Sequence, residues 1–229
     1  MVIEKTSPKI SVIMSVFNDQ KNIESSVNSI LDQTYKNFEL LVRDDGSTDQ
    51  TRKILESIKD KRIKLFTSSK NIGLTKSLNL LIKKSSGTLI ARQDSDDISL
   101  KDRFEIQVNR LISGSYDAVL SRAILKDSSS LRPNFSFYLP KKIVIKYKNP
   151  FIHGTLLIRK KVLIELGMYD ENFIYAQDYK LMKSMIDNGI RFKILKKPLY
   201  VLNTEDNISS NMSEQQEYYA NLVRKNIEL

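Results

Sequence analysis

Three carboxylates, Asp94, Asp96 and Asp97, lie within four residues and come just after the apolar run 88–91. Like charges this close raise one another's pKa and repel, so a folded chain needs a positive group beside them. A divalent cation is the simplest such group, because it takes carboxylate oxygens as hard ligands. In an extended segment Asp94 and Asp96 would point to the same side. The cluster therefore predicts a metal-assisted site at the end of a strand.

A second acidic stretch, residues 44–49, follows the apolar segment 38–43. Apolar, β-branched runs alternate with segments of helical periodicity through the first half of the chain, which predicts βαβ units and a parallel sheet with flanking helices. The predicted strands are 10–17, 38–43, 62–66 and 88–92. Ligands of such α/β sheets bind at the carboxyl ends of strands. Asp44 and Asp94 are two βα units apart, so we expect them to meet in space.

The second half is less regular. We expect one continuous domain with halves 1–112 and 113–229, and an irregular, weakly ordered loop at 127–139. A proline at 198 predicts that the last strand, 192–202, lies at a sheet edge. The other predicted elements are helices at 102–112, 160–166, 177–188 and 212–227, and strands at 117–121 and 154–159.

The composition sets limits on the protein's class. The chain has 229 residues, no cysteine and a formal net charge of +10, which favours anionic partners or reflects solvated surface lysines. The polar stretch 1–9 is unlike a signal peptide, and the apolar runs are far shorter than the roughly 20 residues of a membrane span. We therefore expect a soluble or peripheral protein. The acidic strand ends argue against nucleic acid as a partner.

An ordered set of short motifs resembles the inverting family 2 glycosyltransferases with the GT-A fold, a Rossmann-like α/β fold, and in particular the branch that builds bacterial surface polysaccharides. The likeness runs from about Pro8 to Ser209. Each motif alone is weak, but their order is specific. The motifs are the segments 11–18, 29–35, 44–49, 71–73, 94–97, 102–103, 167–170 and 177–178, with the stretch 149–159 pointing to the polysaccharide branch.

The resemblance implies that a nucleotide-diphosphate sugar, most simply a UDP-sugar, binds over the first half. Asp44 would accept a hydrogen bond from the uracil ring. Val16 and Phe17 would wall the base pocket, or else belong to the core. Ser95 would also contact the donor. A smaller acceptor-side half would complete the fold.

In the same resemblance Asp96 is the direct ligand of Mn²⁺ or Mg²⁺, and Asp94 supports the ribose or the metal shell. Asp97 is expected to cap the following helix. Arg103 either pins the acidic loop by a salt bridge or is solvated.

Asp178 is the general base of the resemblance, and it follows Gln177 where the family usually has glutamate. His153 and Asp170 are expected on the acceptor side, where the alternatives are a hydrogen-bonded structural histidine and a turn aspartate. The acceptor would be a saccharide or a lipid-linked saccharide on the cytoplasmic side of a bacterial membrane.

Two departures from the family pattern leave a second reading open. Leu78 stands where many relatives have arginine, and the stretch 200–203 lacks their Tyr-Arg-x-His. A non-catalytic nucleotide-sugar-binding or scaffold subunit would tolerate both. Residues 131–149 interleave aromatic and basic side chains, which suits either peripheral contact with an anionic membrane or a mobile lid.

Overall fold

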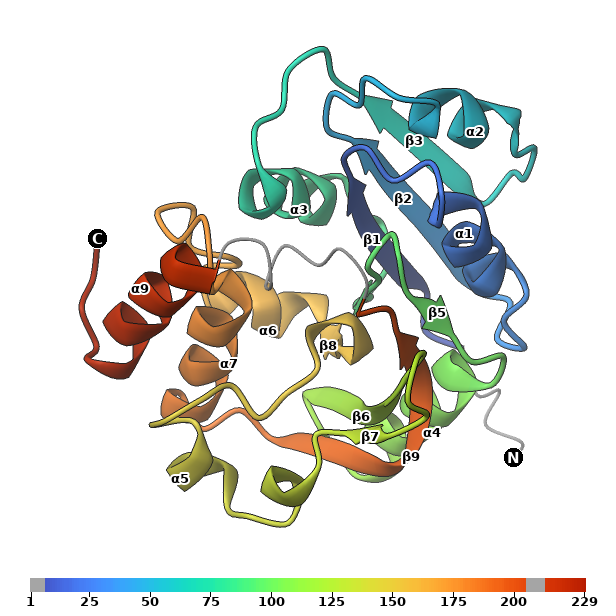
Figure 1. Ribbon diagram of the computed structural model, residues 1–229. Coiled ribbons are helices and arrows are strands. Elements are labelled where there is room, and N and C mark those ends of the chain that lie inside the picture. The colour runs from blue at the N-terminus through green and yellow to red at the C-terminus, as the bar shows by residue number, and fades with distance from the viewer. Residues whose placement is uncertain (1–6, 205–212) are drawn as a thin grey trace, which may run out of the picture.

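A computed structural model describes residues 7–204 and 213–229 as a twisted sheet with helices on both faces (Figure 1). The strands are β1 (Ile10–Val16), β2 (Phe38–Asp44), β3 (Ile63–Thr67), β4 (Leu89–Arg92), β5 (Ile98–Ser99), β6 (Ala118–Leu125), β7 (Leu131–Arg132), β8 (Leu157–Arg159) and β9 (Phe192–Leu202). The α-helices are α1 (Ile23–Leu31), α2 (Thr51–Ser57), α3 (Leu74–Lys84), α4 (Arg103–Ser113), α5 (Lys141–Val144), α6 (Lys160–Glu165), α7 (Gln177–Asp187) and α9 (Ser213–Arg224), with 3₁₀ turns η1 (Phe135–Phe137) and η2 (His153–Thr155).

Within these residues the strand order is β3-β2-β1-β4-β8-β6-β9-β5, with β7 beside β6. The first four strands pair in parallel, as their βαβ pattern predicts. β8 runs antiparallel to both β4 and β6, and it joins the two halves of the chain into one sheet. The expected α/β fold with a mostly parallel sheet is confirmed. The predicted start of the last helix at residue 212 and the end of the resemblance at 209 lie outside the described residues.

The near-continuous apolar sequence of β1 follows from burial on both faces. Ile13 packs into the cluster formed with α3, α7 and α9, while Val12 and Met14 pack into the cluster formed with α1 and α4. Neighbouring strand residues point to opposite faces, so both must be apolar. β1 is thus a buried central strand, and it pairs with β2 and β4, the two strands from which the acidic loops leave.

Three expectations about local structure need correction. β9 is not an edge strand, because β6 lies on one side of it and β5 pairs with its end. Pro198 is accommodated where the β6–β9 register shifts. Residues 127–139 contain β7 and η1. The acidic loop is not extended, since the chain turns at residues 95 and 96. The division at residue 112 stays a prediction.

Candidate active site

Asp44 ends β2 directly beside Val16, the last residue of β1. Its Oδ1 accepts the Ser47 backbone N–H at 3.0 Å, whereas its Oδ2 is buried and has no hydrogen-bond partner among the described residues. A buried carboxylate oxygen without a donor is costly, so this atom suits an N–H brought by a ligand. Val16 is buried in the core, while the Phe17 side chain is 48% exposed and can offer its ring.

The adjacent Asp45 does a different job. Its carboxylate accepts the backbone N–H groups of Ile72 and Gly73, at 3.2 and 2.9 Å, and pairs with Arg43. These contacts hold the loop that leads into α3. Asp45 is therefore a structural residue. Of the two carboxylates, only that of Asp44 has a buried oxygen without a hydrogen-bond partner among the described residues.

The acidic loop after β4 is braced from three elements. Ser26 of α1 donates to the Asp94 carbonyl at 2.8 Å, and the Asp94 N–H donates to the hydroxyl of Tyr200 on β9 at 3.0 Å. Ser95 donates to Asp19, which follows β1, at 2.7 Å. Because the backbone of the loop is tied on several sides, its carboxylates have fixed positions.

Arg92 supplies a positive charge that the sequence prediction overlooked. Its side chain is almost completely buried, and its guanidinium forms an ion pair with Asp94. Burial alone would lower the pKa of Arg92, but the charge of Asp94 and its neighbours outweighs burial and raises it. One of the three negative charges of the acidic cluster, that of Asp94, is thus balanced by a side chain of the protein and not by a metal ion.

Asp96 and Asp97 remain poorly compensated. Burial, with the nearby Asp94 charge, raises the pKa of Asp96 to about 7 and also raises the pKa of Asp97. The Asp97 carboxylate accepts the Asn203 backbone N–H at 2.7 Å. It therefore ties the loop to the end of β9, and the expectation that it caps α4 is wrong.

Arg103 braces the same loop, but neither alternative for it is correct: it forms no salt bridge with a described residue, and it is buried rather than solvated. Its buried guanidinium donates to the Gln93 side chain at 3.1 Å, the Ser99 hydroxyl at 2.7 Å and the Arg92 carbonyl at 2.9 Å. Burial lowers its pKa to about 10. Neutral acceptors surround this arginine because the carboxylates of the loop point elsewhere.

The donor set fits a divalent ion that has other ligands as well. No group of three or more Asp, Glu, His or Cys side chains surrounds one point within the described residues. Asp96, with its raised pKa, is a carboxylate that a cation would stabilise, and Asp94 is its neighbour. Mg²⁺ is commonly held by one or two carboxylates together with substrate phosphates. The loop therefore matches a metal that arrives with a phosphorylated ligand.

Asp178 lies in the first turn of α7, where the helix dipole favours a carboxylate. The Asn149 amide donates to its Oδ2 at 2.8 Å. The next residue, Tyr179, donates its hydroxyl to the Ile145 carbonyl at 2.6 Å, so the segment before β8 is tied to α7 twice. Gln177, at the preceding position, is buried.

His153 forms a hydrogen bond of 2.6 Å with the Tyr169 hydroxyl. Burial, followed by the charge of Arg92, lowers the pKa of His153 to about 4, so the ring is neutral near pH 7. The charges of Asp94 and Asp178 also act on this ring. His153 is thus close enough to both Asp94 and Asp178 to feel their charges.

Two further contacts involve neighbouring residues. Asn79 of α3 exchanges hydrogen bonds with the backbone of Tyr169, at 2.8 and 3.1 Å. Gly154 lies against Tyr200, and a Cβ at this position would come within 2.4 Å of the Tyr200 hydroxyl oxygen. Asp170 accepts the Asn172 N–H at 3.0 Å inside its own turn, so its place on the acceptor side stays a prediction.

The structure brings Asp94, Asp178 and His153 into one electrostatic neighbourhood, with Asp44 on the strand beside β1. Sequence reasoning missed Arg92, Asn149, Tyr169 and Tyr200. A charged residue at the end of an otherwise apolar strand was a signal for Arg92. The partners of Asp178 and His153 left no such signal, because they come from loops far along the chain.

The sequence is similar to those of known glycosyltransferases. The sequence profile described as Glycosyl transferase family 2 matches residues 11–167. The putative glycosyltransferase EpsE of Bacillus subtilis is 33% identical over 202 residues, which cover 85% of this chain and 73% of EpsE. The Escherichia coli protein WfgD, a UDP-Glc:alpha-D-GlcNAc-diphosphoundecaprenol beta-1,3-glucosyltransferase, is 34% identical over 185 residues, or 79% of this chain and 71% of WfgD.

Solved structures share the fold. S. aureus TarS 1–349 in complex with UDP-GlcNAc superposes with a TM-score of 0.79 at 23% identity, covering 94% of this chain and 65% of that one. The chain spans 40% of a longer TarS structure. A mannosyltransferase of Pyrobaculum calidifontis, in complex with GDP-Man and Mn²⁺, gives a TM-score of 0.70 at 20% identity over 94% of this chain and 62% of that one. The expected GT-A fold is confirmed, and by its match over 11–167 the chain belongs to glycosyl transferase family 2.

Proposed function

We propose that this glycosyltransferase is an inverting, metal-dependent enzyme that moves a sugar from a UDP-sugar to a saccharide hydroxyl. The observation that carries the donor assignment is the buried Oδ2 of Asp44, which lacks a partner among the described residues. Uracil presents one imide N–H, and a carboxylate facing it makes a charge-assisted hydrogen bond. The exposed ring of Phe17 lies one residue beyond Val16, the strand partner of Asp44, and can cover the base.

The diphosphate would lie over the acidic loop, where Asp96, supported by Asp94, would hold Mn²⁺ or Mg²⁺. When bound, the ion offsets the negative charge that develops on the leaving diphosphate. The ion pair with Arg92 holds the Asp94 side chain in place, and the contacts of Ser26 and Tyr200 hold the loop backbone. The Mn²⁺ complex of the Pyrobaculum mannosyltransferase is in keeping with this assignment.

Asp178 is proposed as the general base. Its carboxylate takes the proton of the acceptor hydroxyl, and the oxygen forms a bond to the anomeric carbon. The bond from that carbon to the diphosphate oxygen breaks at the same time, and UDP departs. A single displacement inverts the anomeric carbon. The Asn149 hydrogen bond, which fixes the carboxylate, supports this role.

For the acceptor, we propose a lipid-linked saccharide of a bacterial surface polysaccharide, used on the cytoplasmic side of the membrane. The name of WfgD, which acts on a diphosphoundecaprenol-linked sugar, and that of the O-antigen biosynthesis glycosyltransferase WbnJ support this class. Transfer of a hexosyl or N-acetylhexosaminyl group fits both WfgD and the UDP-GlcNAc complex of TarS.

Calorimetry with UDP and Mn²⁺ tests the donor assignment. Asp44→Ala should weaken UDP binding roughly 10- to 100-fold, the range expected for a hydrogen bond to a charged group. The Asp44→Ala variant should bind ribose 5-diphosphate, which lacks the base, as tightly as wild type does. The matched control is Asp60→Ala, because Asp60 pairs with Arg62 away from the strand ends. Equal UDP affinity in wild type and Asp44→Ala would refute the donor assignment.

A nucleotide-sugar-binding subunit without catalysis is the second candidate. Leu78, at the position where relatives carry arginine, is fully buried in the core, and Asn203 is buried as well. Neither position offers a cation to the diphosphate. UDP release from a panel of donors decides between the two functions. Identical background rates for wild type, Asp178→Asn and Asp96→Ala would favour the binding subunit.

A further inference from the structure

The stretch from Ser128 to Ile164 contains no aspartate or glutamate, although acidic residues are spread over the rest of the chain. Such a run creates a local positive potential beyond that of the overall net charge. Its basic residues are Arg132, Lys141, Lys142, Lys146, Lys148, Arg159, Lys160 and Lys161.

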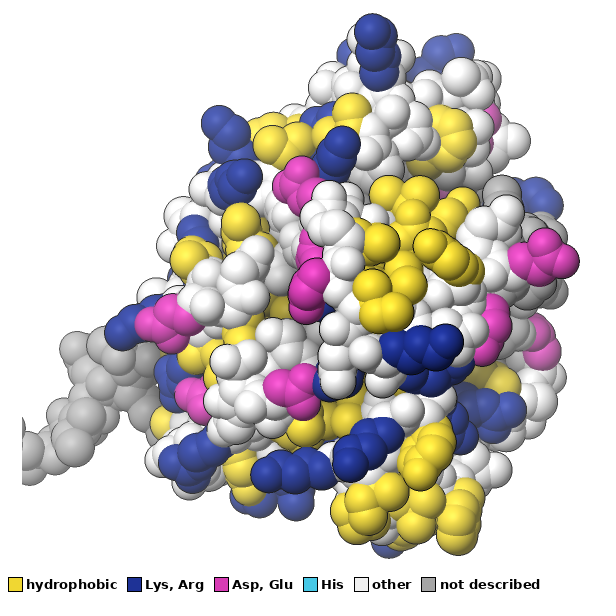
Figure 2. Space-filling model, turned by 90° about the vertical axis from the view of Figure 1, so that its left-hand side faces the viewer, with side chains coloured by type: hydrophobic (Ala, Val, Ile, Leu, Met, Phe, Trp, Pro, Cys, Tyr) yellow, Lys and Arg dark blue, Asp and Glu magenta, His cyan; other side chains and the backbone are white. Residues whose placement is uncertain are grey.

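Large aromatic side chains of this stretch face solvent. Phe135 and Tyr147 are each 71% exposed, and Tyr138 is 65% exposed. We call these three residues, together with the exposed Lys142, Lys146 and Lys148, the basic-aromatic face. Figure 2 shows hydrophobic side chains gathered at the lower part of this side of the molecule, with lysine and arginine side chains around them. Contiguous exposed apolar surface of this kind marks an interaction site.

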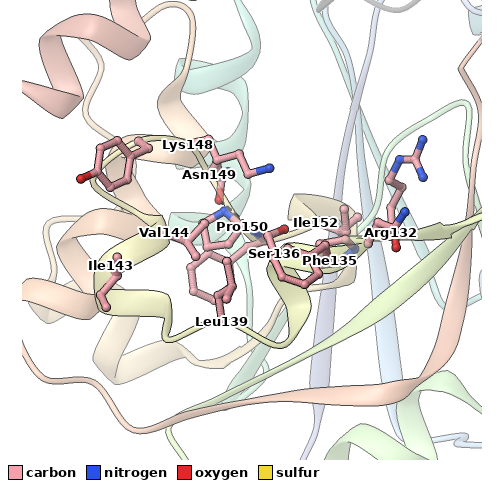
Figure 3. Close-up of a pocket in the computed structure, with 14 residues that line it drawn as sticks. Arg132, Phe135, Ser136, Leu139, Ile143, Val144, Lys148, Asn149, Pro150 and Ile152 are labelled. Atoms are coloured by element: carbon pink, nitrogen blue, oxygen red, sulfur yellow. Dashed lines mark hydrogen bonds between the residues drawn. The ribbon is translucent and has the colours of Figure 1, made fainter.

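A hollow of about 600 Å³ lies beneath the face. Its walls are mainly apolar, and Figure 3 shows the lining side chains between Ile143 at one end and Arg132 at the other. Phe135 and Tyr147 are among the residues that line it. Both are mostly exposed, so only part of each ring packs against the protein.

The backbone beneath the face is firmly held. The Lys141 ammonium donates to three carbonyls of the preceding turn, those of residues 136, 137 and 139, at 2.7 to 2.9 Å. Arg224 of α9 donates to the Tyr147 carbonyl at 2.9 Å. Lys141 is thus used inside the fold, whereas Lys142, Lys146 and Lys148 make no ion pair with any residue that the structure describes.

We propose that the basic-aromatic face docks on a lipid bilayer that contains anionic lipids. Aromatic side chains settle at the level of the headgroups, and nearby lysines are attracted by the negative surface potential. The face combines both features in one short stretch that contributes no carboxylate. The neighbouring Glu217 of α9 is paired with Arg224, the residue that also contacts Tyr147, so its charge is partly offset. A protein partner would need matching acidic and apolar groups, and this alternative is separated by the test below.

The position of the basic-aromatic face indicates how the protein would be oriented on the bilayer. Asn149 belongs to the same segment and donates to Asp178, and Tyr179 ties Ile145 to α7. The bilayer would therefore lie beside the acceptor side of the site. This inference concerns where the protein binds, and it does not depend on catalysis.

Vesicle co-sedimentation tests the proposal with phosphatidylcholine vesicles that contain or lack phosphatidylglycerol. Wild type should bind only the anionic vesicles, and binding should weaken as salt increases. The triple variant Lys142→Gln, Lys146→Gln, Lys148→Gln should bind about 100-fold more weakly, since each lysine near the surface contributes several-fold. Phe135→Ser with Tyr147→Ser should weaken binding at least about tenfold, and both side chains are exposed enough for the fold to survive.

Matched controls keep the charge and apolar changes equal but place them elsewhere. Lys53, Lys59 and Lys61, on or just after α2 at the other end of the molecule, are changed together to Gln. Ile112 and Leu80, both exposed and outside the stretch 128–164, are changed together to Ser. These controls should bind like wild type. Control variants that lose as much binding as the face variants would overturn the proposal, because net charge alone would then explain binding. The proposal would also be overturned if wild type did not bind the anionic vesicles. The face would then be better explained as a binding site for another protein.

Discussion

The proposed donor half, residues 1–112, and the proposed acceptor half, residues 113–229, position their candidate functional side chains by different means. In the donor half β1 pairs with β2 over the full length of both strands, and Asp44 is the last residue of this ladder. Asp94 comes two residues after the end of β4, which pairs with the other side of β1. In the acceptor half β8 pairs with β6 through only two residue pairs. There, Asp178 is positioned by the side chain of one loop residue, Asn149.

This difference shows how one fold can serve many acceptors. A site set by backbone ladders changes little when surface residues are replaced. A site set by pairs of side chains can be altered by single substitutions. The four predictions below test this contrast between backbone-held and side-chain-held groups.

The largest effect is expected for Asp178→Asn. We predict that kcat falls on the order of 10²–10⁴-fold, because the acceptor hydroxyl loses its base. UDP affinity, measured by calorimetry, should stay at the wild-type value, since the donor half is unchanged. Asp187→Asn, at the other end of α7, is the control. A parallel loss of UDP binding would contradict the separation of the two halves.

Asp96→Ala should come next, with kcat lowered on the order of 10²–10³-fold. Unlike Asp178→Asn, it should also weaken UDP binding in the presence of Mn²⁺. Chelation of the metal should reduce wild type to the level of this variant and leave the variant itself unaffected. A variant that still responds to added Mn²⁺ would mean that other residues hold the ion.

Asn149→Ala should lower kcat about tenfold through Asp178, with unchanged UDP affinity. Asn149 also accepts the Phe151 N–H at 3.0 Å, so alanine loosens the local turn as well. Asn149→Asp separates the two roles. It keeps the side-chain oxygen that accepts the Phe151 N–H, but it places a second negative charge beside Asp178. It should be slower than Asn149→Ala; equal rates for both variants would assign the effect to the turn.

Glu39→Gln should change stability and leave activity intact, because Glu39 lies near the start of β2, away from the carboxyl ends. Burial opposes its ionisation, but hydrogen bonds from Lys64 and two serines outweigh burial and hold the pKa of Glu39 well below its usual range. This stabilisation is present above the unfolded pKa of about 4.3 and is lost as pH falls toward the folded value.

Denaturant unfolding should therefore show the Glu39→Gln variant to be less stable by about 1–3 kcal/mol at pH 7, with a gap that narrows below about pH 4. Glu56→Gln, an exposed residue paired with Arg52, should show almost no difference at either pH. A gap that is independent of pH would mean that lost packing, and not the charge of Glu39, sets the stability.

Much of the donor half was predictable from its sequence. Apolar runs of strand length, separated by helical periodicity, located β1 to β4, and the rule for parallel sheets brought residues 44 and 94 to one edge. The prediction failed inside the acidic loop. Asp97 bonds the end of β9 rather than α4, because the chain turns at residue 95, and no local pattern reports a partner 106 residues away.

The acceptor half was less predictable for the same reason. Helical periodicity found α7 and hence Asp178, but the contacts of Asp178 with Asn149 and of His153 with Tyr169 depend on how irregular loops pack. The edge expectation for β9 failed because β5, two residues long, carries too little sequence pattern to be recognised.

The contact between Gly154 and Tyr200 affects the acidic loop of the donor half. Gly154 leaves the space that the Tyr200 ring needs in order to reach the acidic loop. Tyr200 accepts the Asp94 N–H, and it reaches that position only because residue 154 has no side chain. Any larger residue would push the phenol ring outward and pull its hydroxyl from the acidic loop. Residue 154 is therefore constrained during evolution, since a side chain there would shift the loop that we propose holds the donor.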